Sequence, residues 1–159
     1  MAFCTELVRK RLHWNRSGDE FILNHDDKEL CRMQSSPVQV ECVFGGKGVT
    51  IRRKGLLKPR VEVLTSEGMV GEIGQMQAFE PVLEMEDGSV YTVRYLNDSN
   101  TALAFFDDQK ANVMEFTDIS TWSTPRTELV VNRTLHDGHA KVLMPLGHYL
   151  LMLRRQVFN

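Results

Sequence analysis

The sequence lacks the features of an exported or disulfide-stapled protein. Its three cysteines, Cys4, Cys31 and Cys42, are odd in number and show no C-x-x-C spacing, which favours free thiols in a reducing compartment over a disulfide framework. The N-terminal stretch MAFCTELVRKRL also lacks the apolar run of a signal peptide, because charge interrupts it from Glu6 onward. These absences predict a cytoplasmic protein, and a peripheral position at a membrane is one form of that location.

The sequence also has no apolar run long enough for a transmembrane helix. Its most apolar stretch runs from Val142 to Leu153, and a helix of this length spans roughly 18 Å of a hydrocarbon core that is about 30 Å thick. Such a helix would be apolar on every side and must therefore be enclosed. We expect a buried helix here and no transmembrane span; a membrane-dipping tail and a strand are the alternatives.

Composition indicates an ordinary globular chain. Apolar residues make up 42% and charged residues 25% of the 159 positions, which indicates neither disorder nor a membrane protein. A chain of this length buries roughly two-thirds of its unfolded surface, enough for a core without staples. We expect a single domain over residues 1–159.

Residues 1–117 lack a 3.6-residue hydrophobic period and instead show a turn signal about every ten residues. The strongest signal is Asp87-Gly88, because the favoured two-residue hairpin turn needs positive φ at both central positions. Val40, Cys42 and Phe44 alternate with other residues, as in a half-buried strand. The pattern predicts an antiparallel meander of about ten strands, and closure into a barrel would remove its unpaired edges.

The limits of the C-terminal helix are open in the sequence. Asp137 could cap a helix that starts at Gly138, but Pro145 would then lie in the interior, where it costs about 3 kcal/mol. Alternatively, a strand ends at Met144 and Pro145 opens the helix, a position that suits proline. We expect a helix that is kinked or begins near Pro145.

Three segments resemble the tubby C-terminal-like superfamily, which includes the phospholipid scramblases and the plant LURP-one-related proteins. They are the hairpins LEMEDGSVYTVRY and LAFFDDQKANVMEF and the ending DGHAKVLMPLGHYLLMLRR. The resemblance implies a closed antiparallel barrel of about twelve strands around a central apolar helix. The chain departs from the pattern at Pro145 and Gly147, and it lacks a cysteine-rich palmitoylated segment. Only the architecture is therefore transferred, without scramblase activity or the phosphoinositide-binding residues of tubby.

The charges are unevenly placed, although the formal net charge is only −2. Residues 61–128 carry thirteen acids against three bases, whereas residues 47–60 carry no acid. A local basic field attracts anionic membranes and similar surfaces. We expect this run to bind anionic lipid head groups or an acidic protein surface. The candidate ligand-binding residues are its six bases: Lys47, Arg52, Arg53, Lys54, Lys58 and Arg60.

A structural role competes with this functional interpretation of the basic run. Lys and Arg commonly keep an edge strand from pairing with other chains. Strand alternation would place Arg52 and Lys54 on one side of the sheet and Arg53 on the other. Nucleic acid is a less favoured partner, because no aromatic residue lies inside the run to stack on bases.

Other candidate chemistry is better explained by structure. His136, Asp137 and His139 lack zinc-type spacing and fit turn chemistry before a helix, while His148 fits a satisfied core histidine. No catalytic residue, metal or cofactor is predicted. The sequence favours a non-enzymatic module that binds anionic phospholipid or phosphoinositide head groups. The alternative is a lipocalin-like carrier of a small apolar ligand in the barrel lumen, which requires the C-terminal helix to lie outside.

Overall fold

Alternating strands connected by turns fold into a closed antiparallel barrel around one helix. The computed structural model describes residues 3–35 and 39–154, and over these residues it has twelve strands, one short 3-10 helix and the helix α1, Asp137–Arg154. The short helix is η1, Thr5–Leu7. The strands are β1 Arg11–Ser17, β2 Glu20–His25, β3 Lys28–Ser35, β4 Gln39–Phe44, β5 Lys47–Lys54, β6 Arg60–Thr65, β7 Gly68–Ile73, β8 Val82–Met85, β9 Val90–Tyr95, β10 Ala102–Phe106, β11 Asn112–Asp118 and β12 Arg126–Val131.

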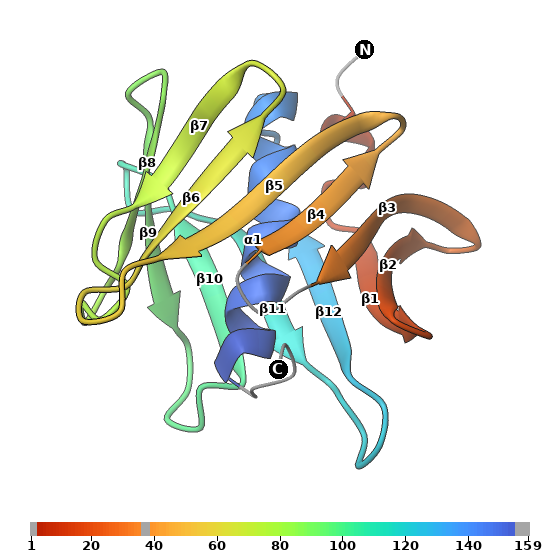
Figure 1. Cartoon of the computed structure of the whole chain (residues 1–159). Coiled ribbons are helices and arrows are strands. Elements are labelled where there is room, and N and C mark those ends of the chain that lie inside the picture. The colour runs from red at the N-terminus through yellow and green to blue at the C-terminus, as the bar shows by residue number, and fades with distance from the viewer. Residues whose placement is uncertain (1–2, 36–38, 155–159) are drawn as a thin grey trace.

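The strand order follows the chain around the barrel, and β1 pairs with β12 to close it. Because every pair is antiparallel, successive connections alternate between the two ends (Figure 1). We call the end at which α1 finishes the lower rim; it carries the connections 55–59, 74–81, 96–101 and 119–125. The opposite end, where α1 begins, is the upper rim. The predicted barrel is therefore confirmed, with twelve strands in place of the ten that the turn signals alone gave.

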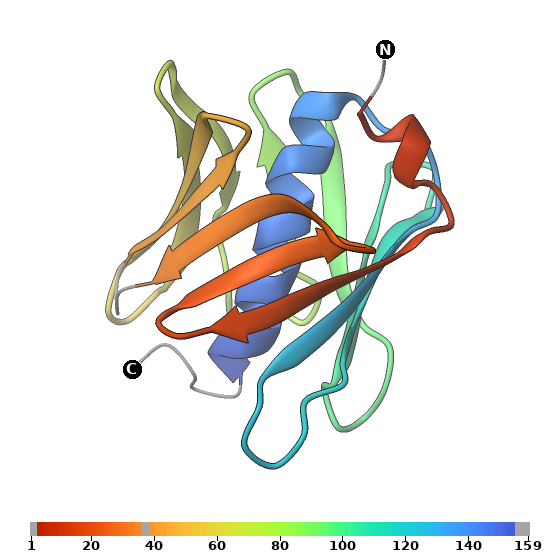
Figure 2. The same cartoon turned by 90° about the vertical axis from the view of Figure 1, so that its right-hand side faces the viewer.

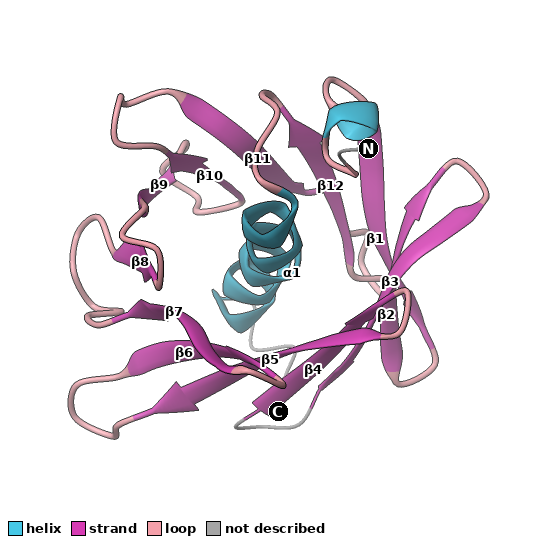
Figure 3. Cartoon of the chain, turned by 90° about the horizontal axis from the view of Figure 1, so that it is seen from above, coloured by secondary structure: helices cyan, strands magenta, loops and turns pink. Residues whose placement is uncertain are grey.

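The helix α1 lies inside the barrel (Figure 3). Residues 142–152 are all buried, so the prediction that this apolar segment is enclosed by sheet is confirmed. The inward face of each strand completes the core, as with Val40, Cys42 and Phe44 on β4. No helix among the described residues is long and apolar enough to cross a bilayer.

The helix begins at Asp137 and continues through Pro145. We expected a helix that is kinked or begins near Pro145, and of these two forms the second is wrong. The local cost of an interior proline is about 3 kcal/mol, and enclosure of the whole apolar helix outweighs it. The barrel wall also contacts the backbone here, since the indole Nε1 of Trp14 donates to the carbonyl of Met144 at 3.2 Å. Tertiary packing thus overrides the local signal.

The start of α1 is joined to the N-terminal segment. The carboxylate of Asp137 accepts hydrogen bonds from the backbone N–H groups of Phe3 and Cys4 at 2.9 and 3.0 Å, and Figure 2 shows this segment beside the start of the helix. His136 caps the helix instead: its Nδ1 accepts from the N–H of Gly138 at 3.1 Å. The hydrogen bonds from Cys4 and Phe3 are the main cause that holds the pKa of Asp137 below its usual range.

His148 is buried in the barrel core, as predicted, but within the described part of the chain its ring is not fully satisfied. Its ring stacks on Trp14 and meets the edge of Phe21, and its Nδ1 lies 2.9 Å from Oγ1 of Thr127. Its Nε2 has no hydrogen-bond partner among the described residues. Burial lowers the pKa of His148 to about 3, so the ring is neutral at neutral pH.

The buried neutral histidine should make the protein less stable in acid. Its folded pKa lies below the unfolded value of about 6.5, so its contribution to stability is complete above pH 6.5 and is lost as pH falls toward 3. Between pH 7 and pH 5 the free energy of unfolding should fall by about 2 kcal/mol through this group. Urea unfolding of His148→Gln at both pH values should show that this part of the decrease is absent. An equal decrease in both proteins contradicts the assignment.

Candidate functional site

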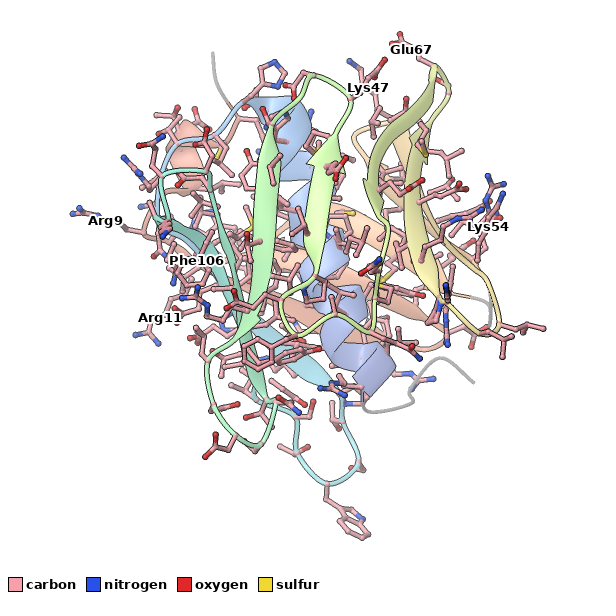
Figure 4. All side chains as sticks on the ribbon, turned by 90° about the vertical axis from the view of Figure 1, so that its left-hand side faces the viewer. Arg9, Arg11, Lys47, Lys54, Glu67 and Phe106 are labelled. Carbon is pink, nitrogen blue, oxygen red and sulfur yellow. The ribbon has the colours of Figure 1, made fainter. Side chains whose placement is uncertain are left out.

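The six bases of the predicted site do not form one patch. Arg52 and Lys54 point outward together, as alternation predicted, and both contact the carboxylate of Glu62 on β6, at 3.0 and 3.4 Å. The hydrogen bond from Arg52 is the main cause that lowers the pKa of Glu62. Lys47 lies at the upper rim, where Figure 4 shows it with Glu67 and away from Lys54. Two of the six therefore share one carboxylate, and a third is at the other end of the barrel.

The other three bases lie at or beside the lower rim. Arg53 and Arg60 stand at the end of β5 and the start of β6, and Lys58 lies in the connection between them; all three are exposed. Arg53 lies on the inward face of β5. Burial raises the pKa of Tyr149 on α1, and the positive charge of Arg53 partly opposes this effect. Within the part of the chain that the structure describes, none of the three has a carboxylate within 4 Å. They keep their positive charge available for a partner.

The connection 55–59 places two leucines in solvent. Leu56 is 99% and Leu57 is 89% exposed, and both lie between Lys54 and Lys58 in the sequence. Gly55 has φ +86°, and a Cβ there would lie 2.5 Å from the carbonyl oxygen of Lys58. The turn thus requires glycine, and its tight closure directs the two leucines outward.

Neighbouring connections at the lower rim present further exposed apolar side chains. Phe79 in connection 74–81 is 97% exposed, and Trp122 in connection 119–125 is 100% exposed. Leu96 in connection 96–101 is exposed to a smaller degree. Because β5 to β12 are successive in the barrel, these connections are neighbours along one rim. The four most exposed large apolar side chains of the described chain therefore gather at one end.

The end of α1 adds a base to this rim. Arg154 is exposed, and its guanidinium lies 4.9 Å from the centre of the Tyr95 ring. Its charge opposes the effect of burial, which raises the pKa of Tyr95. The rim is not free of acids, since Asp98 is exposed there, whereas Glu80 is paired with Arg94 at 2.6 Å. We call the following set the rim surface: Arg53, Leu56, Leu57, Lys58, Arg60, Phe79, Trp122 and Arg154.

A groove of about 530 Å³ opens beside the rim surface, between α1 and the wall formed by β7, β9 and connection 74–81. Most of its lining is apolar, including Met76, Val93, Leu150 and Leu153. A second cleft of about 820 Å³ lies at the upper rim, around the start of α1. Its lining mixes Lys47 and other bases with several carboxylates.

A hydrogen-bonded chain of three side chains crosses the upper cleft. The ring of His139 lies 2.8 Å from the Tyr91 hydroxyl through Nδ1 and 2.7 Å from the Asp87 carboxylate through Nε2. Hydrogen bonds from Ser89 are the main cause that lowers the pKa of Asp87 to about 2, and burial raises the pKa of Tyr91 to about 12. Tyr91 is therefore a neutral phenol at neutral pH. The chain ties α1 to the β8–β9 hairpin.

Comparison with known proteins supports the fold and not a function. The chain is similar to the X-ray structure of a protein from Arabidopsis thaliana, with a TM-score of 0.60 and 10% sequence identity, over 92% of this chain and 94% of that one. No family model matches the sequence. No curated protein matches it either. At this identity the likeness establishes a shared architecture.

The position of α1 contradicts the hypothesis of a lipocalin-like carrier. That hypothesis needed the helix outside the barrel, whereas the helix is buried inside it.

Sequence reasoning also missed the exposed leucines, although a signal was present. An apolar pair that follows Gly55 in a turn and lies between lysines is typical of an exposed tip, because a tight turn at a strand end faces solvent.

Proposed function

We propose that the protein is a non-enzymatic module that binds anionic phospholipid membranes peripherally through the rim surface. One observation carries the proposal: Leu56 and Leu57 are almost fully exposed beside Arg53, Lys58 and Arg60, which have no carboxylate partner in the described chain. Peripheral membrane binding combines these two contributions, burial of apolar side chains at the acyl boundary and attraction of bases to anionic head groups.

The magnitudes favour binding when both contributions act together. Each base near an anionic surface contributes about 1 kcal/mol, and each large apolar side chain that leaves water contributes about 1.5 to 3 kcal/mol. Leu56, Leu57 and Lys58 lie in one short connection, so one approach of the rim can engage both kinds of group. The expected affinity falls with salt, because exposed charges are screened beyond about 8 Å at physiological ionic strength.

The arrangement of the apolar tips favours a bilayer over an acidic protein surface. Leu56, Phe79 and Trp122 lie on three separate connections, and each is almost fully exposed. A protein partner would need a matching hollow for each tip. A bilayer interface is fluid and accepts all three at once, with aromatic rings at the head-group level.

We also infer the superfamily to which the chain belongs and its location in the cell. Twelve strands closed around a C-terminal helix support membership of the tubby C-terminal-like superfamily, which the sequence resemblance suggested. Anionic lipids concentrate in the cytoplasmic leaflet. A cytoplasmic protein that is peripheral at that leaflet fits the proposed binding.

Reversal of two rim charges should weaken binding strongly. The double variant Lys58→Glu, Arg60→Glu should reduce partition onto phosphatidylserine-containing vesicles by at least about thirtyfold at low salt, since each lost base contributes about 1 kcal/mol. Sedimentation with vesicles measures it. The matched control is Lys10→Glu, Lys28→Glu, which reverses two exposed bases at the upper rim. Equal loss in both double variants, or in neither, contradicts the proposal.

A further inference from the structure

We propose that the groove beside the rim surface holds one acyl chain of an anionic phospholipid, with the phosphate at Arg154. The inference rests on the proposed function for the source of the lipid, because it assumes that the lower rim faces a bilayer. It adds a defined lipid site to a surface that would otherwise bind the membrane only by general attraction.

The size and lining of the groove fit an apolar chain. Its volume of about 530 Å³ lies within the range of roughly 300 to 1,000 Å³ that is usual for ligand sites. The walls are apolar side chains from both the barrel and α1. They include Ile73, Met76, Ala78, Val93, Leu150 and Leu153.

The groove exists because α1 does not fill the barrel evenly. The helix packs closest to β10, β11 and β5, and the groove lies on the side of β7 and β9. Connection 74–81 forms its outer wall and is held by two backbone hydrogen bonds, from Met76 N–H to the Pro59 carbonyl at 3.0 Å and from Val93 N–H to the Pro81 carbonyl at 2.8 Å. The groove is therefore built into the fold, and the bond to Pro59 ties its outer wall to connection 55–59, which carries the exposed leucines.

The charges at the groove favour an anion at one position. Two arginines line it, but Arg94 is paired with Glu80 at 2.6 Å. Arg154 lies on the face of Tyr95 and has no carboxylate within 4 Å in the described chain. A guanidinium has five N–H donors, so its contact with Tyr95 leaves donors for phosphate oxygens. Phe79, at the exposed end of the same lining, would meet the bilayer beside the bound lipid.

The test uses dihexanoyl-phosphatidic acid below its micellar concentration, measured by titration calorimetry on the full chain. We expect saturable binding that weakens about tenfold or more in Ala78→Trp, which fills the groove, and in Arg154→Glu, which removes the charge-assisted hydrogen bonds. The matched controls are Val43→Trp on the outer wall and Lys28→Glu at the upper rim, and both should bind like the unaltered protein. Inorganic phosphate alone should bind far more weakly than the lipid.

A second measurement covers the case in which Ala78→Trp fails to fold. In the unaltered protein the lipid should shift the methyl NMR signals of Leu150 and Leu153 and leave those of Leu7, near the upper rim, in place. Absence of saturable binding, equal affinity for inorganic phosphate, or unmoved Leu150 and Leu153 signals overturns the groove site.

Parallel vesicle binding separates this inference from the proposed function. Ala78→Trp should lose monomeric lipid and keep most vesicle binding, whereas the double variant Leu56→Glu, Leu57→Glu should lose vesicles and keep monomeric lipid. If vesicles bind but Ala78→Trp takes up the lipid as well as Val43→Trp does, the groove site is wrong and the rim surface stands. If the lipid binds and vesicles do not, the rim proposal is wrong and a bilayer is not the source.

Discussion

Replacement of both Leu56 and Leu57 by glutamate should reduce partition onto phosphatidylserine-containing vesicles by at least about a hundredfold. Two leucine side chains that enter the acyl boundary contribute about 3 to 6 kcal/mol together, and two new carboxylates at the same place oppose the approach to anionic lipid. Fold stability should change little, because both side chains are exposed in the free protein. Vesicle sedimentation and urea unfolding of the same preparation measure the two effects.

A charge-matched control separates insertion from simple repulsion. Val43→Glu, Met69→Glu adds the same two negative charges at apolar positions that are 47% and 46% exposed and lie away from the lower rim. This variant should bind vesicles within a few-fold of the unaltered protein. If it loses binding to the same degree as the leucine variant, net charge and not the connection 55–59 determines binding.

Replacement of Gly147 by alanine should destabilise the protein by about 3 kcal/mol, although alanine is the better helix former by about 1 kcal/mol. A Cβ at position 147 would lie 2.3 Å from two atoms of the Phe116 ring and 2.5 Å from a third. Phe116 is fully buried and packs edge-on against Phe105, so the ring cannot move aside without disturbing the core. Urea unfolding gives the change in the free energy of unfolding.

A double-mutant cycle tests the cause of that loss. Phe116→Leu removes the ring atoms that the new methyl group would meet. The double variant Gly147→Ala, Phe116→Leu should therefore be more stable than the sum of the two single changes predicts. Additive losses, or a single Gly147→Ala variant that is as stable as the unaltered protein, would show that Phe116 does not set the requirement for glycine.

Much of the fold follows from local signals in the sequence. The Asp87-Gly88 turn, the alternation on β4 and the apolar segment of α1 each lie where turn chemistry and hydrophobic period placed them. The start of α1 does not, because the cost of Pro145 is local while the packing that outweighs it comes from strands distant in the sequence. The requirement for glycine at position 147 is also not local, because the Phe116 ring that excludes a Cβ there lies on β11.

The candidate site was predicted less well, for a physical reason. Strand alternation separated Arg52 and Lys54 from Arg53, but their shared contact with Glu62 comes from register, since Arg52 pairs with Glu62 across β5 and β6. The turn at Gly55 and its flanking lysines indicated that Leu57 faces solvent, but that this turn lies beside the other exposed tips at one end of the barrel depends on closure of the sheet. Composition and spacing therefore located the basic run without showing which part of it is available.

The fluorescence of Trp122 tests the central claim most directly. Trp122 is fully exposed on the lower rim, whereas Trp14, the other tryptophan, is fully buried in the core, so a change in emission on membrane binding reports the rim. With phosphatidylserine-containing vesicles the emission should shift to the blue and be quenched by lipids brominated along the acyl chain. Emission that stays unshifted, and that aqueous iodide still quenches while the protein sediments with the vesicles, would show that the rim surface does not enter the membrane.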